Sequence, residues 1–296
     1  MSATTATRPR PTAAGRRRHV GRGVTVATVL TYAILILIAV IYIYPFLISI
    51  ATSFKSQSEA ATDPLSLVPQ TFTTAAYERL LVNSDFPLWF QNSLIVTLIV
   101  TAGRVFFNSL AGYALSRLTF PGRGVIFAAL VGVMAVPSVV LLIPKFLVIN
   151  QLGMYDSYAG LIIPLLADAT GIFIMKNFFE SIPKAVEEAA RIDGAGTFRV
   201  FWSVSLPMAR PAIITIVILA FQGSWNELSH FIVASQSQAL FTLTKGVAQL
   251  SSGALSQGTQ YPLKLGAAVI MTIPVAVLFF VFQRRIMNAS GGAVKE

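Results

Sequence analysis

The chain has 296 residues, of which 55% are hydrophobic and only 11% are charged, and its mean hydropathy is +0.71. Soluble domains carry roughly 25% charged residues, so this composition excludes a water-soluble fold of this size and indicates a membrane protein. The net charge of +10 does not indicate a nucleic-acid partner, because the cations flank apolar runs, and the absence of cysteine with only two histidines excludes disulfides and the usual metal clusters.

Six apolar stretches are long enough, or nearly so, to cross a bilayer, whose core of about 30 Å needs roughly 20 helical residues. In chain order they cover residues 24–51, 92–116, 125–149, 158–178, 211–234 and 265–282. The first stretch is too long for the core of a signal peptide and no small-residue cleavage site follows it, so we expect a retained helix. We therefore predict an all-α integral membrane protein with six transmembrane helices in one domain over residues 24–290, between a basic tail over 1–23 and a short tail over 291–296.

Lysine and arginine gather on the cytoplasmic side of membrane proteins, so their positions predict orientation. Six arginines lie in the basic tail: Arg8, Arg10, Arg16, Arg17, Arg18 and Arg22. If the N-terminus lies inside, the loops expected outside contain only Lys55, Arg79, Lys145, Lys245 and Lys264. We therefore expect both termini in the cytoplasm.

The inner loop over residues 179–210 is helical in character. Strong helix formers run over residues 184–193, with Ser181 as the expected N-cap, and Gly194 and Gly196 end that helix. A second helix follows, for which Thr197 is the expected cap. The loop is therefore predicted to form a helix, a tight turn and a second helix at the inner membrane surface.

The second helix of this loop carries three aromatic residues at helical spacing. Phe198, Phe201 and Trp202 are expected to share one face, and Pro207 is expected to end the helix. An amphipathic helix pair lying on lipid is the simpler interpretation of the loop, but such a pair would carry lysine on its polar side. Small and acidic residues are found there instead: Glu187, Glu188, Ala189, Ala190, Asp193, Gly194, Ala195 and Gly196. Small side chains let another protein approach closely, which favours a docking surface.

The spacing of the loop resembles a known family motif. Glu188-Ala189-Ala190 is followed by three residues, Gly194, nine residues and then Val204-Ser205-Leu206-Pro207. This pattern is similar to the EAA loop of ABC importer permeases, with Val204 in place of isoleucine. Segments 108–122, 225–227 and 291–295 are also similar to carbohydrate-type permeases. The chain therefore resembles the second permease subunit of a carbohydrate importer such as the maltose system.

The resemblance implies a set of partners in the inner membrane of a bacterium or archaeon: a second homologous permease subunit, two ATPase subunits and an extracytoplasmic solute-binding protein. The chain lacks the G-x-x-x-x-G-K-[ST] sequence that cradles nucleotide, so we expect ATP and Mg on the partner ATPase subunits and neither enzyme activity nor a cofactor here. The ATPase would be engaged through residues 188–207, and the tail 291–295 is implied to touch it too. The implied coupling residues are Glu187, Glu188, Ala189, Ala190, Asp193, Gly194, Leu206 and Pro207.

Polar residues inside the expected spans are candidates for lining a solute path. Arg104 and Asp168 lie near the middle of two spans, where a charge costs about 2.5–3.5 kcal/mol, so each should face protein or water. Their opposite signs suggest a pair, but the sequence does not decide whether the two pair. Such a pair either fixes helix packing or lines the path, and Trp225 either stacks on a sugar or anchors the helix at the membrane interface. The candidate path residues are Arg104, Asn108, Asp168, Trp225, Asn226 and Glu227.

Other functions are weighed against this interpretation. An ion-coupled secondary transporter would be expected to show inverted repeats and usually more spans, and a membrane scaffold would leave the loop spacing unexplained. Within the importer class, glycerol phosphate or a polyol is an alternative to a sugar or oligosaccharide, and Arg104 would suit a phosphate. The sequence identifies neither the solute and its contacts, nor the partner ATPase and binding protein, nor the role of the basic tail.

Overall fold

The computed structural model describes residues 26–251 and 260–292, and every regular element in these ranges is helical. The predicted basic tail with its six arginines and most of the tail over 291–296 lie outside the described residues. The chain divides into two compact units, Met1–Leu47 and Ile48–Glu296, which we describe separately.

The described part of the first unit is a single helix. Helix α1 (Val26–Ser53) has 28 residues, includes Pro45 and continues into the second unit with its last residues. Its mean hydropathy of 2.7 over an 18-residue window makes it long and apolar enough to cross a membrane.

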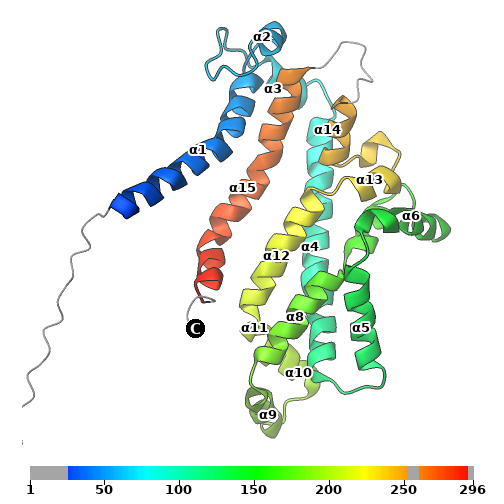
Figure 1. Cartoon of the computed structure of the whole chain (residues 1–296). Helices are drawn as coiled ribbons and strands as arrows, with labels where there is room; N and C mark the ends of the chain where they lie inside the picture. The colour runs from blue at the N-terminus through cyan, green and yellow to red at the C-terminus, as the bar shows by residue number, and fades with distance from the viewer. Residues whose placement is uncertain (1–25, 252–259, 293–296) are drawn as a thin grey trace, which may run out of the picture. The chain divides into compact units, whose positions relative to one another are not determined.

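The second unit is built around helix α4 (Phe86–Arg117), the long helix that runs from one end of the unit to the other in Figure 1. Pro87 lies in its first turn, where a missing N–H does no harm, and Arg117 lies in its last turn, where a cation complements the helix dipole. Its 32 residues span ~48 Å, more than a bilayer core. Helices α8 (Ala169–Ser181) and α12 (Arg210–Trp225) pack along it, and α15 (Tyr261–Gly292) packs against α12.

The third predicted span is bent. Helix α5 (Arg123–Met134) ends before Pro137, and η1 (Ser138–Leu141) and α6 (Leu142–Gln151) leave at 107° to it. Proline has no N–H for the helix ladder and disfavours helix in the residue before it, so the helix ends before Pro137. Pro137 itself is extended, with φ −57° and ψ 132°. A continuous helix over 125–149 is therefore not what forms.

The fourth and fifth predicted spans are also interrupted. In the fourth, α7 (Tyr158–Ile162) and η2 (Ile163–Leu165) lead to an extended Asp168, which caps α8. In the fifth, α12 ends at Trp225 and a separate short helix, α13 (Ser229–Ala234), follows, so residues 211–234 do not form one continuous helix and the break falls at the polar residues after Trp225. Within the described residues, four helices are long and apolar enough to span a membrane, or up to six if each bent pair counts as one span.

The two long connections between the predicted spans, residues 52–91 and the described part of residues 235–264, lie at the same end of the second unit (Figure 1). They contain α2 (Gln57–Thr62), α3 (Ala75–Leu81), η4 (Gln238–Leu240) and α14 (Leu243–Ser251). Both α2 and α3 pack on α15, and α14 packs on α4 and α15. Buried Lys55 orders the first connection by donating to the carbonyl oxygens of Asp63 and Ser66, each at 2.8 Å.

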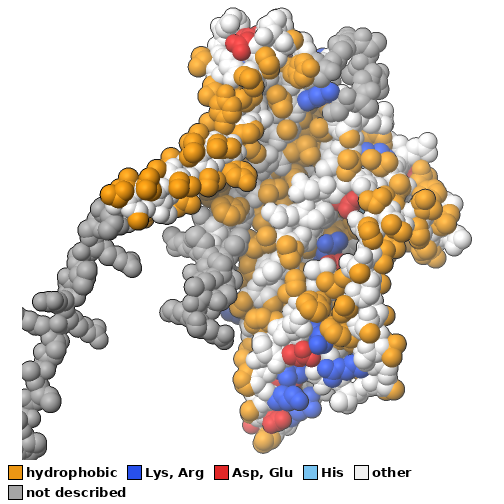
Figure 2. Space-filling view, viewed as in Figure 1, with side chains coloured by type: hydrophobic (Ala, Val, Ile, Leu, Met, Phe, Trp, Pro, Cys, Tyr) orange, Lys and Arg blue, Asp and Glu red, His pale blue; other side chains and the backbone are white. Residues whose placement is uncertain are grey.

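The other end of the second unit, which we call the loop end, holds the helices of residues 184–208. These are α9 (Lys184–Ile192), α10 (Thr197–Val200), the π-helical turn η3 (Phe201–Ser205) and α11 (Leu206–Met208). Figure 2 shows Lys, Arg, Asp and Glu side chains gathered at this end, while over the rest of the visible face a few charged side chains are scattered among apolar and other ones. The charge distribution distinguishes the two ends of the unit.

Candidate functional site

The turn between α9 and α10 depends on Gly194. Its φ of +82° lies in the left-handed region, which glycine adopts without a Cβ penalty. The Gly194 N–H donates to the Arg191 carbonyl and the Ala195 N–H donates to the Ala190 carbonyl, both at 3.0 Å, which is the Schellman arrangement at a helix C-terminus. A Cβ built at Gly194 meets nothing within 4 Å, so the residue is needed for its backbone conformation and the space beside it is open within this chain.

The caps of the two loop helices differ from those predicted. Pro183, and not Ser181, is the N-cap of α9, and Gly196 is the N-cap of α10 with no side-chain bond from Thr197. Pro207 lies inside α11, and the bend of 77° into α12 comes after Met208. Proline suits the first turn of a short helix, so it begins α11 where the prediction had it end the preceding helix.

The three aromatic residues of the second loop helix do not share one face. Phe201 is buried against Tyr113, with ring centroids 5.0 Å apart, whereas Phe198 is 72% and Trp202 51% exposed and these two stack on each other. The π-helical turn begins at Phe201. One aromatic residue therefore anchors the loop to the core, while two cover its outer surface.

The predicted coupling residues fall into an exposed group and a buried one. Glu188, Ala189, Asp193, Gly194 and Pro207 are exposed, and Ala190 and Leu206 are half-buried. Glu187 is only 5% exposed and cannot belong to a docking surface, so its assignment as a coupling contact is corrected here. The surface that is open to a partner is the face of α9 that carries Glu188 and Ala189 together with the Gly194 turn.

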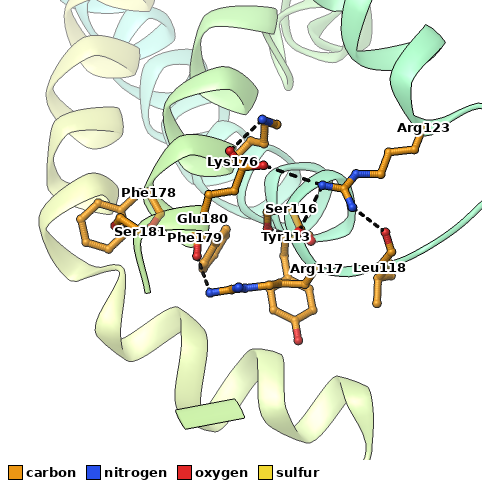
Figure 3. A network of polar contacts seen from close by, with 10 residues as sticks. All are labelled: Tyr113, Ser116, Arg117, Leu118, Arg123, Lys176, Phe178, Phe179, Glu180 and Ser181. Carbon is orange, nitrogen blue, oxygen red and sulfur yellow. Dashed lines mark hydrogen bonds and ion pairs between the residues drawn. The ribbon is translucent and has the colours of Figure 1, made fainter. Parts of the chain in front are cut away.

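Glu187 is buried because it pairs with the cation that ends α4. Arg117 Nε lies 3.0 Å from Glu187 Oε1, and the Ser205 hydroxyl donates to the same oxygen at 2.9 Å. Arg117 Nη2 also donates to the carbonyls of Phe179 and Ile182 at the end of α8, and Figure 3 shows its bond to Phe179. From the sequence, Arg117 counted as an orientation signal and as part of the family-like segment 108–122, and the family motif begins at Glu188, but nothing in either pattern indicated that Arg117 pairs with Glu187.

A second, more exposed network lies beside it in Figure 3. Glu180 of α8 accepts from Lys176 at 2.8 Å and lies 3.7 Å from Arg123 at the start of α5. Arg123 also donates to the carbonyls of Leu118 and Ser116. These contacts connect the ends of α4, α5 and α8, so Arg123 and Lys176 help to hold these three helices together.

Arg104 and Asp168 pair in the middle of the second unit, as their opposite charges suggested. Arg104 Nε lies 3.8 Å from Asp168 Oδ1 and donates to the Leu165 carbonyl at 2.8 Å. Asn108 donates to Asp168 Oδ1 at 2.9 Å and accepts from the Asp168 backbone N–H at 3.2 Å. Asp168 Oδ2 accepts from the Gly171 N–H at 3.1 Å, which is the N-cap bond of α8. The cluster therefore satisfies the backbone at the break before α8 while holding two opposite charges.

Trp225 does not face a path. Its side chain is 1% exposed, its ring stacks on Phe221 with centroids 5.8 Å apart, and its Nε1 donates to the Met271 carbonyl at 3.0 Å. Both the sugar-stacking and the interface-anchor interpretations of Trp225 are therefore corrected, since its ring packs α12 against α15. Asn226 is the exposed C-cap of α12, and Glu227 accepts from the His230 backbone N–H at 2.9 Å.

A polar hollow of 260 Å³ opens where α12 ends beside the bend before η1. Its lining includes Lys145, Asn226, Glu227 and His230, with Gly223 on one side. A Cβ built on Gly223 would lie 3.5 Å from Arg104 Nη1, so the hollow adjoins the cluster of Arg104 and Asp168. The hollow offers both hydrogen-bond donors and hydrogen-bond acceptors, and side chains of both charges, which suits a ligand rich in hydroxyl groups.

Residues 109–288, which include the loop, match the family of binding-protein-dependent transport system inner membrane components. The chain belongs to this family. The permease is 33% identical over 262 residues to the diacetylchitobiose uptake system permease protein NgcG of Streptomyces coelicolor, covering 88% of this chain and 86% of that protein. It is 31% identical to the inner membrane ABC transporter permease protein YcjP of Escherichia coli, covering 89% and 95% of the two chains.

A solved structure and a third relative extend the likeness. The permease is 33% identical to the trehalose transport system permease protein SugB of Mycobacterium tuberculosis, covering 77% of this chain and 84% of that protein. It superposes with a TM-score of 0.78 on a chain of a bacterial ABC transporter involved in the import of the acidic polysaccharide alginate, at 26% identity and covering 89% and 97% of the two chains. The family excludes the secondary-transporter and scaffold alternatives.

Proposed function

We propose that this permease is one of the two transmembrane subunits of an ATP-driven, binding-protein-dependent importer for a sugar or oligosaccharide. The observation that carries the proposal is the loop end, where a Schellman turn at Gly194 presents an exposed small and acidic surface in a chain of the binding-protein-dependent family. Relatives named for diacetylchitobiose, arabinooligosaccharides and trehalose support the solute class.

The loop would dock into a groove of a partner ATPase subunit. Glu188, Ala189 and Gly194 are exposed, and the small side chains leave room for the partner's surface. ATP and Mg would be bound by that partner, and closure of the two ATPase subunits would move the loop as a lever that biases the permease between inward-facing and outward-facing states. A second homologous permease subunit would complete the path.

The loop end would lie in the cytoplasm. It carries Arg117, Arg123, Lys176, Lys184, Arg191 and Arg199, and positive charge is typical of the cytoplasmic side. Both termini would lie on that side, with residues 24–290 forming one domain of six spans, two of them bent. The end formed by α2, α3 and α14 would face the solute-binding protein.

The cluster of Arg104, Asn108 and Asp168 and the adjoining hollow would line one side of the solute path. The side chains of Arg104 and Asp168 are 17% and 32% exposed, so they are open to a path while pairing with each other. Because Asp168 already balances Arg104, the cluster offers hydrogen bonds more than net positive charge, which favours a neutral sugar over glycerol phosphate. Asn226 and Glu227 contribute polar groups at the hollow.

The test is ATP-dependent uptake of radiolabelled di- and oligosaccharides by the reconstituted complex, with three variants of the turn. Gly194→Trp adds bulk to the docking surface and is expected to abolish uptake while the complex still assembles. Gly194→Asn tolerates the left-handed conformation and should retain most uptake. Gly124→Trp, an exposed glycine at the same end with open space around its Cβ, is the matched control for bulk. Normal uptake by Gly194→Trp would overturn the proposed role of the loop.

A further inference from the structure

We infer that Arg117, Glu187 and Ser205 form a clamp that makes the coupling loop rigid with helices α4 and α8, so that a push on the loop moves the spans carrying the Arg104–Asp168 cluster. This inference rests on the proposed function, because it specifies how force from an ATPase partner would pass into the membrane. The two neighbouring glutamates of α9 then have different tasks, with Glu188 facing the partner and Glu187 facing the clamp.

Burial shows that the clamp is interior. The side chains of Arg117 and Glu187 are 5% and 7% exposed, and Ser205 is fully buried. Removing one partner of a buried ion pair leaves an uncompensated buried charge, so separating Arg117 from Glu187 is costly. The exposed contacts of Glu180, whose side chain is 41% exposed, are screened by water and hold their elements more weakly.

The clamp joins four chain segments, three of them through the Arg117 guanidinium and the fourth through the Glu187 carboxylate. Arg117 is the last residue of α4, it bonds the carbonyls of Phe179 and Ile182 where α8 ends, and its partner Glu187 lies on α9. Ser205, from the turn η3, bonds the same carboxylate. The planar guanidinium holds its nitrogens in a fixed geometry, with Nη2 bonding the two carbonyls while Nε lies against Glu187, whereas the ammonium of a lysine is a single point charge without that fixed geometry.

Aromatic packing beside the clamp limits sliding. The Tyr113 ring lies edge-on to Phe179 at 5.5 Å and tilted against Phe201 at 5.0 Å. These three rings come from α4, α8 and η3, the same elements that the polar clamp joins. Packed interiors are stiff, so displacement of α9 passes to α4 and α8 without being absorbed at their junction.

The same two helices carry the polar cluster further along. Asn108 precedes Arg117 by nine residues on α4, which is ~13 Å along the helix, and Asp168 caps the other end of α8. A tilt of α4 and α8 imposed at the clamp therefore changes the surroundings of Arg104, Asn108 and Asp168. The loop end and the proposed path are connected through two continuous helices.

The clamp can be tested by distance measurements, because the chain contains no cysteine. Spin labels on Gly124→Cys in α5 and Arg199→Cys in α10 report the loop against the bundle, and both positions are exposed and lie outside the proposed docking residues. The sample is the whole complex in nanodiscs, in a labelled background that keeps the ATPase activity of the unlabelled complex. The readout is the distribution of electron–electron distances between the two labels.

Arg117→Gln and Glu187→Gln are expected to lose the single narrow distance peak and give a broad distribution. Ser205→Ala removes one hydrogen bond only, so it keeps the complex intact and should broaden the peak less. Lys184→Gln removes an exposed charge from the same helix and should leave the peak unchanged. Unchanged narrow peaks in Glu187→Gln and Ser205→Ala would overturn the clamp.

A second readout separates transmission from simple stability. In complexes that assemble normally, Ser205→Ala and Arg117→Lys should retain ATP hydrolysis while the sugar taken up per ATP falls. Equal loss of hydrolysis and uptake would contradict a transmitting role. If the unmodified complex takes up no sugar with ATP, the proposed function fails, while the distance measurement still decides whether the clamp exists.

Discussion

Helices α4 and α8 approach each other closely at Gly112, and a single added methyl group tests how much this contact contributes. A Cβ built at Gly112 would lie 2.6 Å from Met175 Cβ and 2.8 Å from the Lys176 backbone nitrogen, whereas ordinary contacts are 3.4–4 Å. Lys176 N belongs to the backbone and cannot rotate away. The two helices would therefore have to separate.

The magnitude follows from two opposing terms. Overpacking a well-packed site costs about 1–3 kcal/mol, while alanine in place of a helical glycine gains about 0.5–1 kcal/mol. Gly112→Ala is thus expected to destabilise the permease by roughly 1–2 kcal/mol on balance. Gly132→Ala in α5 is the matched control, since a Cβ there meets nothing within 4 Å and only the favourable term applies.

The assay is thermal unfolding of the purified complex in detergent, followed by the fraction that remains monodisperse after heating. Gly112→Ala should lower the midpoint by several degrees, and Gly132→Ala should leave it unchanged or raise it, because 1 kcal/mol shifts the midpoint by about 2–4 °C in proteins of 150–250 residues. If the melting midpoints of the two variants shift together, or if Gly112→Ala is as stable as the unmodified permease, then α4 and α8 are not packed closely at Gly112 and the reasoning is refuted.

Three further predictions address the polar sites. Asp168→Asn keeps a side-chain acceptor for the N-cap of α8, whereas Asp168→Ala removes it. Asp168→Ala should therefore be less stable than Asp168→Asn by about 1 kcal/mol, and the same melting assay compares the two variants. Trp225→Phe loses the bond to Met271, should lower stability by about 1 kcal/mol, and should leave the KM for sugar uptake unchanged; a raised KM with unchanged stability would return Trp225 to the path. Backbone N–H groups of Gln236 and Ser237 donate to the Asp156 carboxylate and lower its pKa. The stability from these two hydrogen bonds is therefore fully present above the unfolded pKa of about 3.9 and is lost as the pH falls through the pKa of the folded state. Amide protection of Gln236, corrected for intrinsic exchange, should therefore fall at acid pH in the unmodified permease and become independent of this titration in Asp156→Asn.

Local chemistry determined what could be predicted from the sequence. Apolar runs and the scarcity of charge are properties of consecutive residues, so the membrane class and the positions of α1, α4 and α15 were predicted within a few residues at most ends. The family motif also lies in one short segment, and Gly194 ends α9 as predicted because a left-handed turn needs glycine. The opposite charges of Arg104 and Asp168 suggested a pair, because an isolated charge inside a span is costly, and the structure decides that the two lie together.

Tertiary contacts decided the rest. Glu187 and Glu188 are adjacent and chemically identical, and only the arrival of Arg117 and Ser205 from other elements buries one of them. Trp225 lies beside polar residues in the chain, yet Phe221 and α15 enclose its ring. Prolines inside the spans, Pro137 among them, indicated kinks, but only the packing of the helices decided that the chain turns by 107° there and that an extended Asp168 breaks the helix before α8. The sequence by itself determined that this chain crosses a membrane and carries the family's loop, whereas the packing of distant helices decided which of its polar side chains face a partner and which hold the structure together.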